Sequence, residues 1–559
     1  MLRPKSKLYR ALEIAPGILT WLTFVGAIVF SYFAPAWVAV YIILFDLYWV
    51  LKAINTAMHL LSSFFKLQTH ARYDWHERLE KLGNVESYKA ELVSFIAREK
   101  VRRVRRDLAH ELQRLQKVDF KNRLTDFRQI YHLVLLPTYK ESETVLEHSL
   151  SSILASDFSK NQIFFALAIE ERDREQAERI AENLRRKYAH HFFRFAVYLH
   201  PDNLPGEIKA KGANLTWAAR AATAVIGEAG VPLENVIVSA FDSDTVCSRN
   251  YFSYLTYAFL TAQTPHQNSY QPMPVYNNNI WDAPAITRII AVANSFWQMV
   301  EASRPDRLVT FSSHALSLKT LVDVDFWPVD VIADDSQIFW RCWLYHNGDY
   351  RVTPLFTTVS LDAMLDETYF RTLTGQYKQK RRWAWGNSEN IPYLVTNALP
   401  NKQIPWWKKF IYIERMVEGY YFWATASIMI AVLGWLPLIV GGDRFAPNVL
   451  LFNLPFLTRA MMQVATIFLI FSVYINLVLI PPRPPQFSKW RSFNMIFQWV
   501  FVPIVSTVFG SAPAIDAQTR MMFGKYLGFW VTPKARKTQI ADPAMVFGSA
   551  RGKGGQQNA

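Results

Sequence analysis

Two long apolar runs near the N-terminus constrain the fold more than any other feature of the sequence. They cover Gly17 to Phe33 and Trp37 to about Leu51, with Ala34-Pro35-Ala36 between them. As a helix, each run has about the length needed to cross a hydrocarbon core of ~30 Å. We therefore predict a transmembrane helix hairpin within residues 1–66, closed by a tight turn.

A cleaved signal peptide is the alternative interpretation of the first run. Basic residues precede this run, and Ala34-Pro35-Ala36 has the small residues of a cleavage site. A second apolar run follows at once, which favours a retained hairpin. Asp46 lies inside this second run, and we expect it to face another helix or a polar cavity because a carboxylate is costly in lipid.

Charge and cysteine content narrow the class of protein further. The chain is 51% hydrophobic and only 19% charged, with a net charge of +15. Such a charge fits a membrane surface, a nucleic acid or a phosphorylated substrate. Cys247 and Cys342 are the only cysteines, so the sequence predicts no disulfide framework and fits a reducing compartment.

A strongly basic stretch, Ala97 to Lys117, dominates the region of residues 67–128. We expect cytosolic or interfacial helices here that rest against anionic headgroups. Binding to nucleic acid is the alternative, but no base-reading motif accompanies the basic residues, so we expect no nucleic-acid partner.

Residues 129–390 alternate between short apolar runs and helical segments. We expect the apolar runs to be strands and the chain to form a βαβ series with a largely parallel sheet. The predicted strands are His132–Tyr139, Ile163–Glu171, Phe192–His200 and Asn235–Asp244.

The chain after this region is predicted to return to the membrane. We expect interfacial helices at 391–418, two transmembrane helices within 419–480, and a disordered tail at 539–559. The turn after residue 480 and the tail are both basic, which places both inside. One more membrane crossing at Phe493–Gly510 would put the basic turn and the basic tail on opposite sides of the membrane. We therefore interpret residues 481–538 as a re-entrant or interfacial helix, interrupted by Pro503, followed by a loop.

Acidic residues follow several of the predicted strands. Glu170 ends the second strand, and Asp242-Ser243-Asp244 ends a later one. Ligands bind at the carboxyl ends of parallel strands, and two carboxylates there can share a divalent cation on a diphosphate, although such triplets also occur by chance. Asp334-Asp335 precede a helical run, where they could supply a general base or simply cap the helix.

A basic and aromatic stretch, Gln379 to Gly386, reads QKRRWAWG. It could form a belt at the headgroups or part of a site for a phosphate and a sugar. The order of Glu170, Asp242-Ser243-Asp244, Asp334-Asp335 and a QxxRW motif resembles that of membrane-integrated family 2 glycosyltransferases, especially the cellulose, hyaluronan and chitin synthases. A headgroup belt fits Trp406 and Trp407 better, because they lie beside lysines at the start of the returning membrane segment.

This resemblance implies a GT-A-like nucleotide-diphospho-sugar transferase domain, with a mostly parallel sheet and flanking helices, inserted between transmembrane helices. It also implies that Asp335 is the general base, that Arg382 neutralises the leaving diphosphate, and that Trp383 and Gln379 contact the acceptor. Asp244, with Asp242, would hold Mg²⁺ or Mn²⁺. The substrate-binding residues implied in this way are Thr138, Glu141, Glu170, Lys211, Asp242, Asp334, Arg381, Thr532 and Lys534.

A second motif and three departures refine the resemblance. FWVTPK, at Phe529–Lys534, is similar to the FxVTxK gating loop of cellulose synthases, which folds over the nucleotide. Ala333-Asp334-Asp335 stands where cellulose synthases have a T-E-D run that ends in the catalytic acid, and the segment similar to their acceptor site reads TFSSHA at Thr310–Ala315. The chain also has fewer predicted crossings than those synthases.

From this resemblance we expect an inverting, metal-dependent enzyme that uses a UDP-sugar. We expect a processive β-polysaccharide synthase coupled to membrane export, and the alternative is a non-processive enzyme that glycosylates a membrane lipid. The partners would be the donor, a growing polysaccharide or lipid acceptor, and the bilayer, with a homo-oligomer or an export partner left open. The expected location is the bacterial cytoplasmic membrane, with the catalytic domain facing the cytosol.

Overall fold

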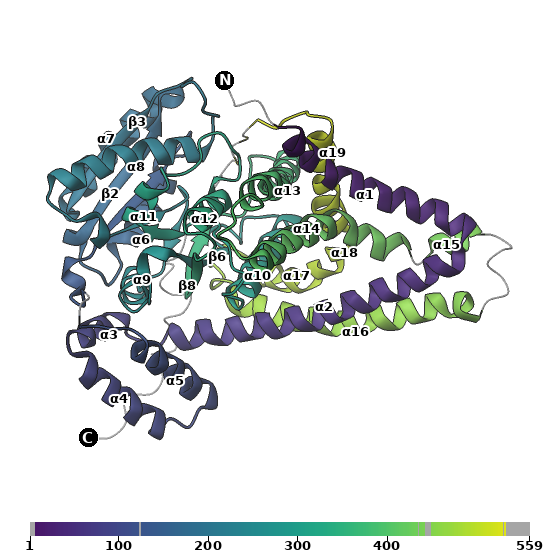
Figure 1. The fold of residues 1–559 in the computed structure, drawn as a ribbon, viewed down its shortest axis with the longest axis horizontal. Coiled ribbons are helices and arrows are strands. Elements are labelled where there is room, and N and C mark those ends of the chain that lie inside the picture. The colour runs from purple at the N-terminus through teal and green to yellow at the C-terminus, as the bar shows by residue number, and fades with distance from the viewer. Residues whose placement is uncertain are drawn as a thin grey trace.

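A computed structural model shows a sheet with flanking helices at one end and a group of long helices at the other (Figure 1). The structure describes residues 6–121, 124–433, 435–441, 449–528, 530 and 532. Within these residues, the helices long and apolar enough to cross a membrane are Lys7–Phe33, Pro35–His70, Trp406–Leu433 and Lys489–Met522.

The first two helices form the hairpin expected from the apolar runs. Helix α1 covers Lys7–Phe33, and α2 covers Pro35–His70, with Pro35 in its first turn, where its missing N–H costs no hydrogen bond. Helix α2 continues well beyond the apolar run because Leu60, Phe64 and Leu67 pack in a buried cluster with side chains of the sheet and of the helix at Ala285–Ala302. Asp46 faces another helix, since Thr458 of α16 donates a hydrogen bond of 2.8 Å to it.

Three short helices follow the hairpin and pack beside the sheet. They are α3 (Trp75–Lys81), α4 (Val85–Arg98) and α5 (Arg102–Gln116). The basic stretch is divided between α4 and α5, because the backbone of Glu99 is extended. The apolar side chains of all three helices join the core on one side of the sheet.

The sheet is mixed, in the strand order β3-β2-β1-β4-β7-β6-β8-β5. Strands β3, β2, β1 and β4 are parallel to one another, as the βαβ pattern predicts. Strand β7 is antiparallel to both of its neighbours, and β6 and β8 are parallel to each other. The strands are β1 (Tyr131–Pro137), β2 (Ile163–Glu170), β3 (Arg194–His200), β4 (Val236–Ala240), β5 (Val246–Cys247), β6 (Asn268–Tyr276), β7 (Ala315–Ser317) and β8 (Arg351–Leu361).

Helices cover both faces of this sheet, so its inner strands are apolar on both sides. Alternate residues of β1 enter different cores: Val134 and Leu136 enter one, and Leu133 and Leu135 the other. The first face carries α6 (Glu143–Leu154), α7 (Arg174–Tyr188) and α9 (Tyr251–Leu260), and the second carries α8 (Lys211–Glu228), α11 (Leu318–Asp323) and α12 (Asp334–Tyr345). This arrangement confirms the GT-A-like fold class.

The remaining helices join the sheet domain to the long helices. Helix α10 lies beside β6 and α2, while α13 and α14 form an antiparallel pair in which the apolar end of α13 joins the core of the sheet. Their bounds are α10 (Ala285–Ala302), α13 (Tyr369–Ala398), α14 (Trp406–Ile428), α15 (Leu436–Gly441), α16 (Val449–Leu479), α17 (Lys489–Phe497), α18 (Val502–Val505) and α19 (Ala512–Met522).

The segment from α17 to α19 is a chain of short helical pieces. A 3₁₀ turn at Gln498–Phe501 and a π-helical turn at Ser506–Ser511 interrupt it, on either side of Pro503. Helix α19 packs against α1, and Thr20, near the middle of α1, donates a hydrogen bond of 2.7 Å to Gln518. The predicted re-entrant or interfacial course of this segment stays a prediction.

Candidate active site

The carboxyl ends of β1 and β4 carry residues that bind one another. Thr138 follows β1, and its hydroxyl donates a hydrogen bond of 2.9 Å to Oε2 of Glu141. The hydroxyl of Ser243, in the loop after β4, donates a hydrogen bond of 2.9 Å to Oε1 of the same glutamate. Parallel strands thus bring the first turn and the DSD loop together at one edge of the sheet.

Lys211, at the start of α8, joins two of the predicted acids. Its ammonium lies 2.6 Å from Oδ1 of Asp242 and 3.0 Å from Oδ1 of Asp335. Burial alone would lower the pKa of this lysine, but the carboxylates of Asp242, Asp335 and Asp334 outweigh burial and raise its pKa. Lys211 is therefore a fixed positive charge between the two acidic segments.

Asp334 and Asp335 stand next to each other at the start of α12 but differ in environment. Asp334 is 3% exposed, and burial, followed by the charge of Asp335, raises its pKa to about 8. The side chain of Asp335 is 28% exposed and lines a cavity while paired to Lys211. The arrangement leaves Asp334 protonated near neutral pH and presents the Asp335 carboxylate to the cavity.

Two glycines allow the backbone to bring these elements together. A Cβ on Gly212 would lie 2.6 Å from the carbonyl oxygen of Pro328 and 2.8 Å from Cβ of Asp334. A Cβ on Gly386 would lie 2.8 Å from Cβ of Ala333. Helices α8 and α13 therefore pack directly against the segment that carries the two acids, and the final glycine of QKRRWAWG serves this contact.

Helix α13 presents the QxxRW residues from the opposite side of the cavity. Gln379, Arg382 and Trp383 all line it. Burial lowers the pKa of Arg382, while the nearby carboxylates, Asp242 first, act in the opposite direction. Arg381 points elsewhere, because its guanidinium forms an ion pair of 2.8 Å with Asp516 of α19.

The described part of the FWVTPK segment lies against α13. Thr532 lines the cavity, and Gln379 donates a hydrogen bond of 3.4 Å to its hydroxyl. The ring of Trp530 lies 5.5 Å from the ammonium of Lys378. Lys534 lies outside the described residues.

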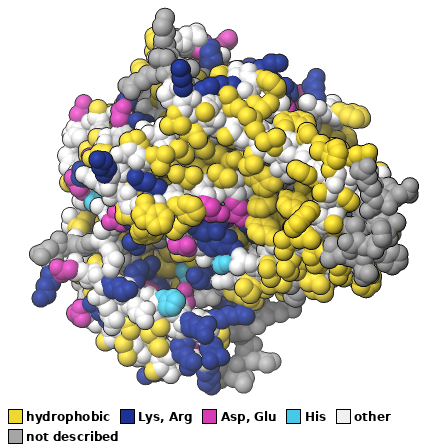
Figure 2. All heavy atoms as spheres, turned by 45° about the vertical axis from the view of Figure 1, so that its right-hand side comes forward, with side chains coloured by type: hydrophobic (Ala, Val, Ile, Leu, Met, Phe, Trp, Pro, Cys, Tyr) yellow, Lys and Arg dark blue, Asp and Glu magenta, His cyan; other side chains and the backbone are white. Residues whose placement is uncertain are grey.

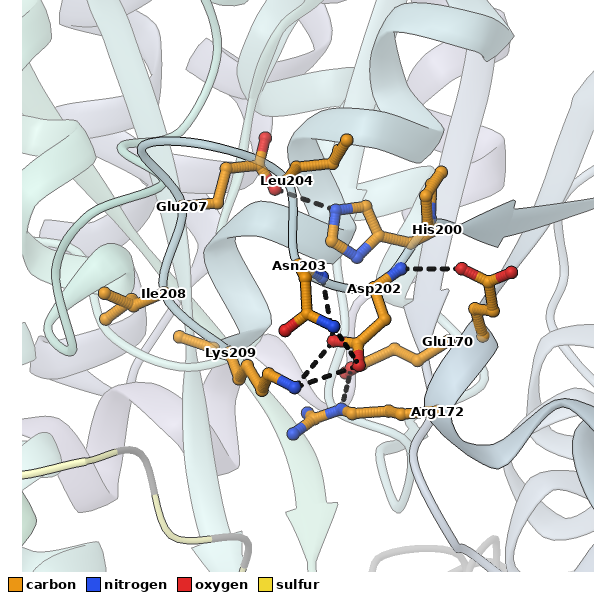
Figure 3. A pocket seen from close by; sticks show the side chains of 12 residues that line it. Glu170, Arg172, His200, Asp202, Asn203, Leu204, Glu207, Ile208 and Lys209 are labelled. Atoms are coloured by element: carbon orange, nitrogen blue, oxygen red, sulfur yellow. Dashed lines mark hydrogen bonds and ion pairs between the residues drawn. The ribbon is translucent and has the colours of Figure 1, made fainter. Parts of the chain in front are cut away.

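Glu170 lies where a small second pocket meets the large cavity, and it lines both. The small pocket has a volume of about 60 Å³ and follows the ends of β2 and β3 (Figure 3). In it, Glu170 is paired with Arg172, and His200 lies 2.9 Å from Glu207. The guanidinium of Arg172 stacks 3.8 Å from the ring of Tyr139.

The large cavity has a volume of about 960 Å³ and extends far beyond the acids. It continues along α10 to side chains of α2 and α14. Its aromatic lining includes Trp49, Trp297, Trp340, Trp383, Tyr412, Phe422, Trp423 and Trp499. The site is therefore continuous with a passage that reaches the long helices.

Sequence reasoning missed two residues of this cavity. Ser312 donates a hydrogen bond to Oδ2 of Asp242, and it lies in the TFSSHA segment that the resemblance marked only as a departure. Lys380 lies within QKRRW; its ammonium binds Asn294 at 2.9 Å and lies 5.2 Å from the ring of Trp383. Burial lowers the pKa of Lys380 to about 8.

The acids have the right chemistry for a divalent cation on a diphosphate, since hard cations prefer carboxylate oxygens. Among the described residues, no group of three or more His, Cys, Asp and Glu side chains is arranged to hold a metal by itself. Asp242 and Asp244 nevertheless lie together in the cavity, and the backbone N–H of Asp362 donates a hydrogen bond of 2.8 Å to Asp244. A pair of this kind fits an ion whose other ligands come from the substrate.

Residues 237–481, which include the DSD loop, both aspartates of α12 and the QxxRW residues, match the family model described as glycosyl transferase family group 2. This match identifies the segment as a glycosyltransferase. No curated protein matches the chain. The particular resemblance to cellulose, hyaluronan and chitin synthases stays a prediction.

Solved structures of sugar-nucleotide transferases also align with this glycosyltransferase. A mannosyltransferase, PcManGT from Pyrobaculum calidifontis in complex with GDP-Man and Mn²⁺, aligns with a TM-score of 0.38 and 14% identity over 82% of this chain and 100% of its own. S. aureus TarS 1–349 in complex with UDP-GlcNAc aligns with a TM-score of 0.35 and 12% identity over 71% of this chain and 93% of its own. Similarities of this size carry no assignment of substrate.

Proposed function

We propose that this glycosyltransferase is an inverting, metal-dependent enzyme that uses a UDP-sugar to extend a β-linked polysaccharide and couples this synthesis to export. One observation carries the proposal. A single cavity contains the acids, Arg382 and Trp383, and continues along an aromatic lining to the long helices. Aromatic rings offer flat apolar surfaces that suit the C–H faces of sugars.

The donor would bind at the edge of the sheet. Thr138, Glu141 and Glu170 would contact the nucleoside, and all three line the cavity. Asp244, supported by Asp242, would hold Mg²⁺ or Mn²⁺, which when bound supplies positive charge to the diphosphate oxygens. Thr532 and Lys534 would add contacts to the diphosphate, and the role of Arg381 in substrate binding stays a prediction.

The transfer step uses Asp335 as the base. Its carboxylate takes the proton of an acceptor hydroxyl as the hydroxyl oxygen forms a bond to the anomeric carbon. The bond from that carbon to the diphosphate oxygen breaks on the opposite side, so UDP leaves with the bonding electrons and the configuration inverts. Arg382 neutralises the charge that develops on the diphosphate.

The acceptor would occupy the passage beyond Asp335. Trp383 would present its ring to the acceptor sugar, and Gln379 would hydrogen-bond its hydroxyls. Lys380 and Asn294 lie next along this passage, where their polar groups can bind a sugar that has moved on by one residue.

Transfer to a membrane lipid is the second candidate function. It is favoured because the cavity reaches Lys52 of α2 and Glu418 of α14, two helices that are long and apolar enough to cross a bilayer. For either function we propose that the protein is integral to the bacterial cytoplasmic membrane with its catalytic domain in the cytosol. A homo-oligomer or an export partner stays a prediction.

Product size tests the proposal. Purified protein in lipid vesicles is incubated with Mg²⁺ and a panel of radiolabelled UDP-sugars, and the labelled product is sized. A large product that a matching glycosidase degrades supports a synthase and names its sugar. A labelled lipid that extracts into organic solvent establishes the second candidate instead, and no transfer from any UDP-sugar contradicts both.

A further inference from the structure

The end of the large cavity that lies away from the acids is strongly basic. Arg304 and Arg307 follow α10, Arg415 lies on α14 and Lys52 on α2, and all four line the cavity. The proposed transfer reaction needs no charge here, because its diphosphate binds at the other end. Asn294, which binds Lys380, and Ala302, the last residue of α10 before Arg304, are about 12 Å apart along the helix axis, so one phosphate cannot touch both ends.

The two glutamates that line this end of the cavity are already paired. Glu301 accepts a hydrogen bond from Arg415, and Glu418 accepts one from Lys52. Among the residues that the structure describes, neither Arg304 nor Arg307 forms an ion pair. The two guanidinium groups therefore face the cavity without a direct carboxylate partner in the described part of the chain, although the charges of Glu301, Asp306 and Glu418 act on Arg304.

Several donors of these arginines are buried and unused. In the described part of the chain, Nε of Arg304, Nε of Arg307 and Nη1 of Arg415 have no hydrogen-bond partner. Among the described contacts, the guanidinium of Arg304 donates a hydrogen bond to the side-chain oxygen of Asn55. Burial, followed by the charge of Arg307, lowers the pKa of Arg304, while the charges of Glu301, Asp306 and Glu418 act in the opposite direction. Buried donors of this kind normally have a partner, and an anion would supply one to all three.

The position of the cluster indicates where the anion comes from. Lys52 and Asn55 follow Leu51 on α2, and Leu51 is 58% exposed, as expected for a side chain that faces lipid. Figure 2 shows hydrophobic side chains gathered over the long helices, with basic, acidic and histidine side chains around a recess where this surface ends. Basic groups at the edge of an apolar belt lie at the level of lipid headgroups.

We propose that Arg304, Arg307, Arg415 and Lys52 form a binding site for the phosphate group of a membrane lipid. Guanidinium groups suit phosphate because their planar fork matches its oxygens. The acyl chains would extend along the exposed apolar faces of α2 and α14, and the phosphate would lie inside the basic end of the cavity. This inference goes beyond the proposed function, since the site is separate from the donor and from Asp335.

Direct lipid binding tests this site without any sugar nucleotide. Purified full-length protein in neutral detergent is titrated with short-chain phosphatidic acid, with diacylglycerol of the same chain length, or with inorganic phosphate. Binding is followed by native mass spectrometry and by tryptophan fluorescence, because several tryptophans line the cavity. We expect phosphatidic acid to bind at least tenfold more tightly than either of the other two.

Arg307→Gln is the decisive variant, because the side chain of Arg307 makes no described hydrogen bond that its removal would break. We expect the Arg307→Gln variant to bind phosphatidic acid about tenfold more weakly. The double variant, Arg304→Gln with Arg307→Gln, should bind phosphatidic acid more weakly still. Arg128→Gln is the matched control, since Arg128 is 72% exposed and lies outside the cavity.

Three outcomes would overturn the inference. Wild-type affinity for phosphatidic acid in the Arg307→Gln variant would show that the lipid binds elsewhere. Equal binding of diacylglycerol would show that the phosphate is not recognised, and equal binding of inorganic phosphate would make this a site for a free anion. Loss of sugar transfer alone would bear on the proposed function and not on this site, because the titration contains no donor.

Discussion

Asp335 and Asp334 are adjacent in the chain, yet they differ in environment. Asp335 lines the cavity with a side chain that is 28% exposed and pairs with Lys211. Asp334 is 3% exposed and has a raised pKa. The sequence alone does not show which of these two adjacent carboxyl groups is the proposed base and which is buried with a raised pKa.

The base role of Asp335 leads to a specific expectation for Asp335→Asn. The amide keeps the shape of the side chain but cannot take a proton, so transfer should fall by roughly 10²-fold or more. Binding of UDP, measured by calorimetry, should be retained. Near wild-type transfer in this variant would move the base role elsewhere, with Asp334 as the next candidate.

Burial of Asp334 should make folding stability depend on pH. Its pKa in the folded state is raised to about 8, above that of an unfolded chain, so the folded state holds this proton more tightly. Stability from this group is complete below the unfolded pKa and is lost as pH rises to about 8. As the pH rises from 4 to 9, the melting temperature of the wild type should therefore fall relative to that of the Asp334→Asn variant. A difference between the two proteins that does not change with pH would contradict this prediction.

At the scale of elements, close packing of α13 decides how the acids are held. Gly386 of α13 leaves no room for a Cβ beside Ala333, which precedes Asp334. Different residues of the QKRRWAWG stretch therefore have different contacts. Arg382 and Trp383 face the cavity, and Gly386 sets the distance between α13 and the segment that carries the two acids.

Gly386→Ala should push Ala333 and the two acids out of place. Overpacking of this kind costs about 1–3 kcal/mol, so we expect a lower melting temperature together with reduced transfer. Gly227→Ala is the control, because Gly227 lies within α8 and a Cβ there meets nothing within 4 Å. That substitution should stabilise the protein by about 0.5–1 kcal/mol, since alanine favours the helix. Equal effects of the two changes would show that packing against Ala333 is unimportant.

At the scale of the whole molecule, the orientation of the long helices in the membrane determines on which side of the membrane the cavity opens. The proposed topology places the basic helices and the turn before α17 in the cytosol, and the link between α15 and α16 outside. Residues 442–448 of that link lie outside the described residues. Cys247 and Cys342 are both buried, so introduced cysteines can be labelled without removing them.

Labelling with a membrane-impermeant maleimide tests this topology. Intact cells should label Asn448→Cys, whereas Lys100→Cys and Ser488→Cys should react only after the membrane is opened. Labelling of Ser488→Cys in intact cells would place the turn before α17 outside and would contradict the interfacial course proposed for the segment that follows it.

The helix hairpin, the first strands and the acidic strand ends of this protein could be predicted from the sequence. Apolar runs predicted the helix hairpin, short apolar segments predicted β1 to β4, and acids at strand ends predicted the edge at which Asp242 and Asp244 lie. These features depend on neighbouring residues, because helix and strand periodicity and the ends of strands are local properties. The extension of α2 to His70 was not predicted, because contacts of its last turns with distant segments decide it.

The ion pairs and the shifted pKa values of the site depend on the tertiary structure. Lys211 meets Asp242 and Asp335 across the fold, and the raised pKa of Asp334 follows from its burial. The basic end of the cavity is assembled from α2, α14 and the residues after α10. Burial and the distance between charges depend on how remote segments pack, and no local pattern in the chain encodes either of them.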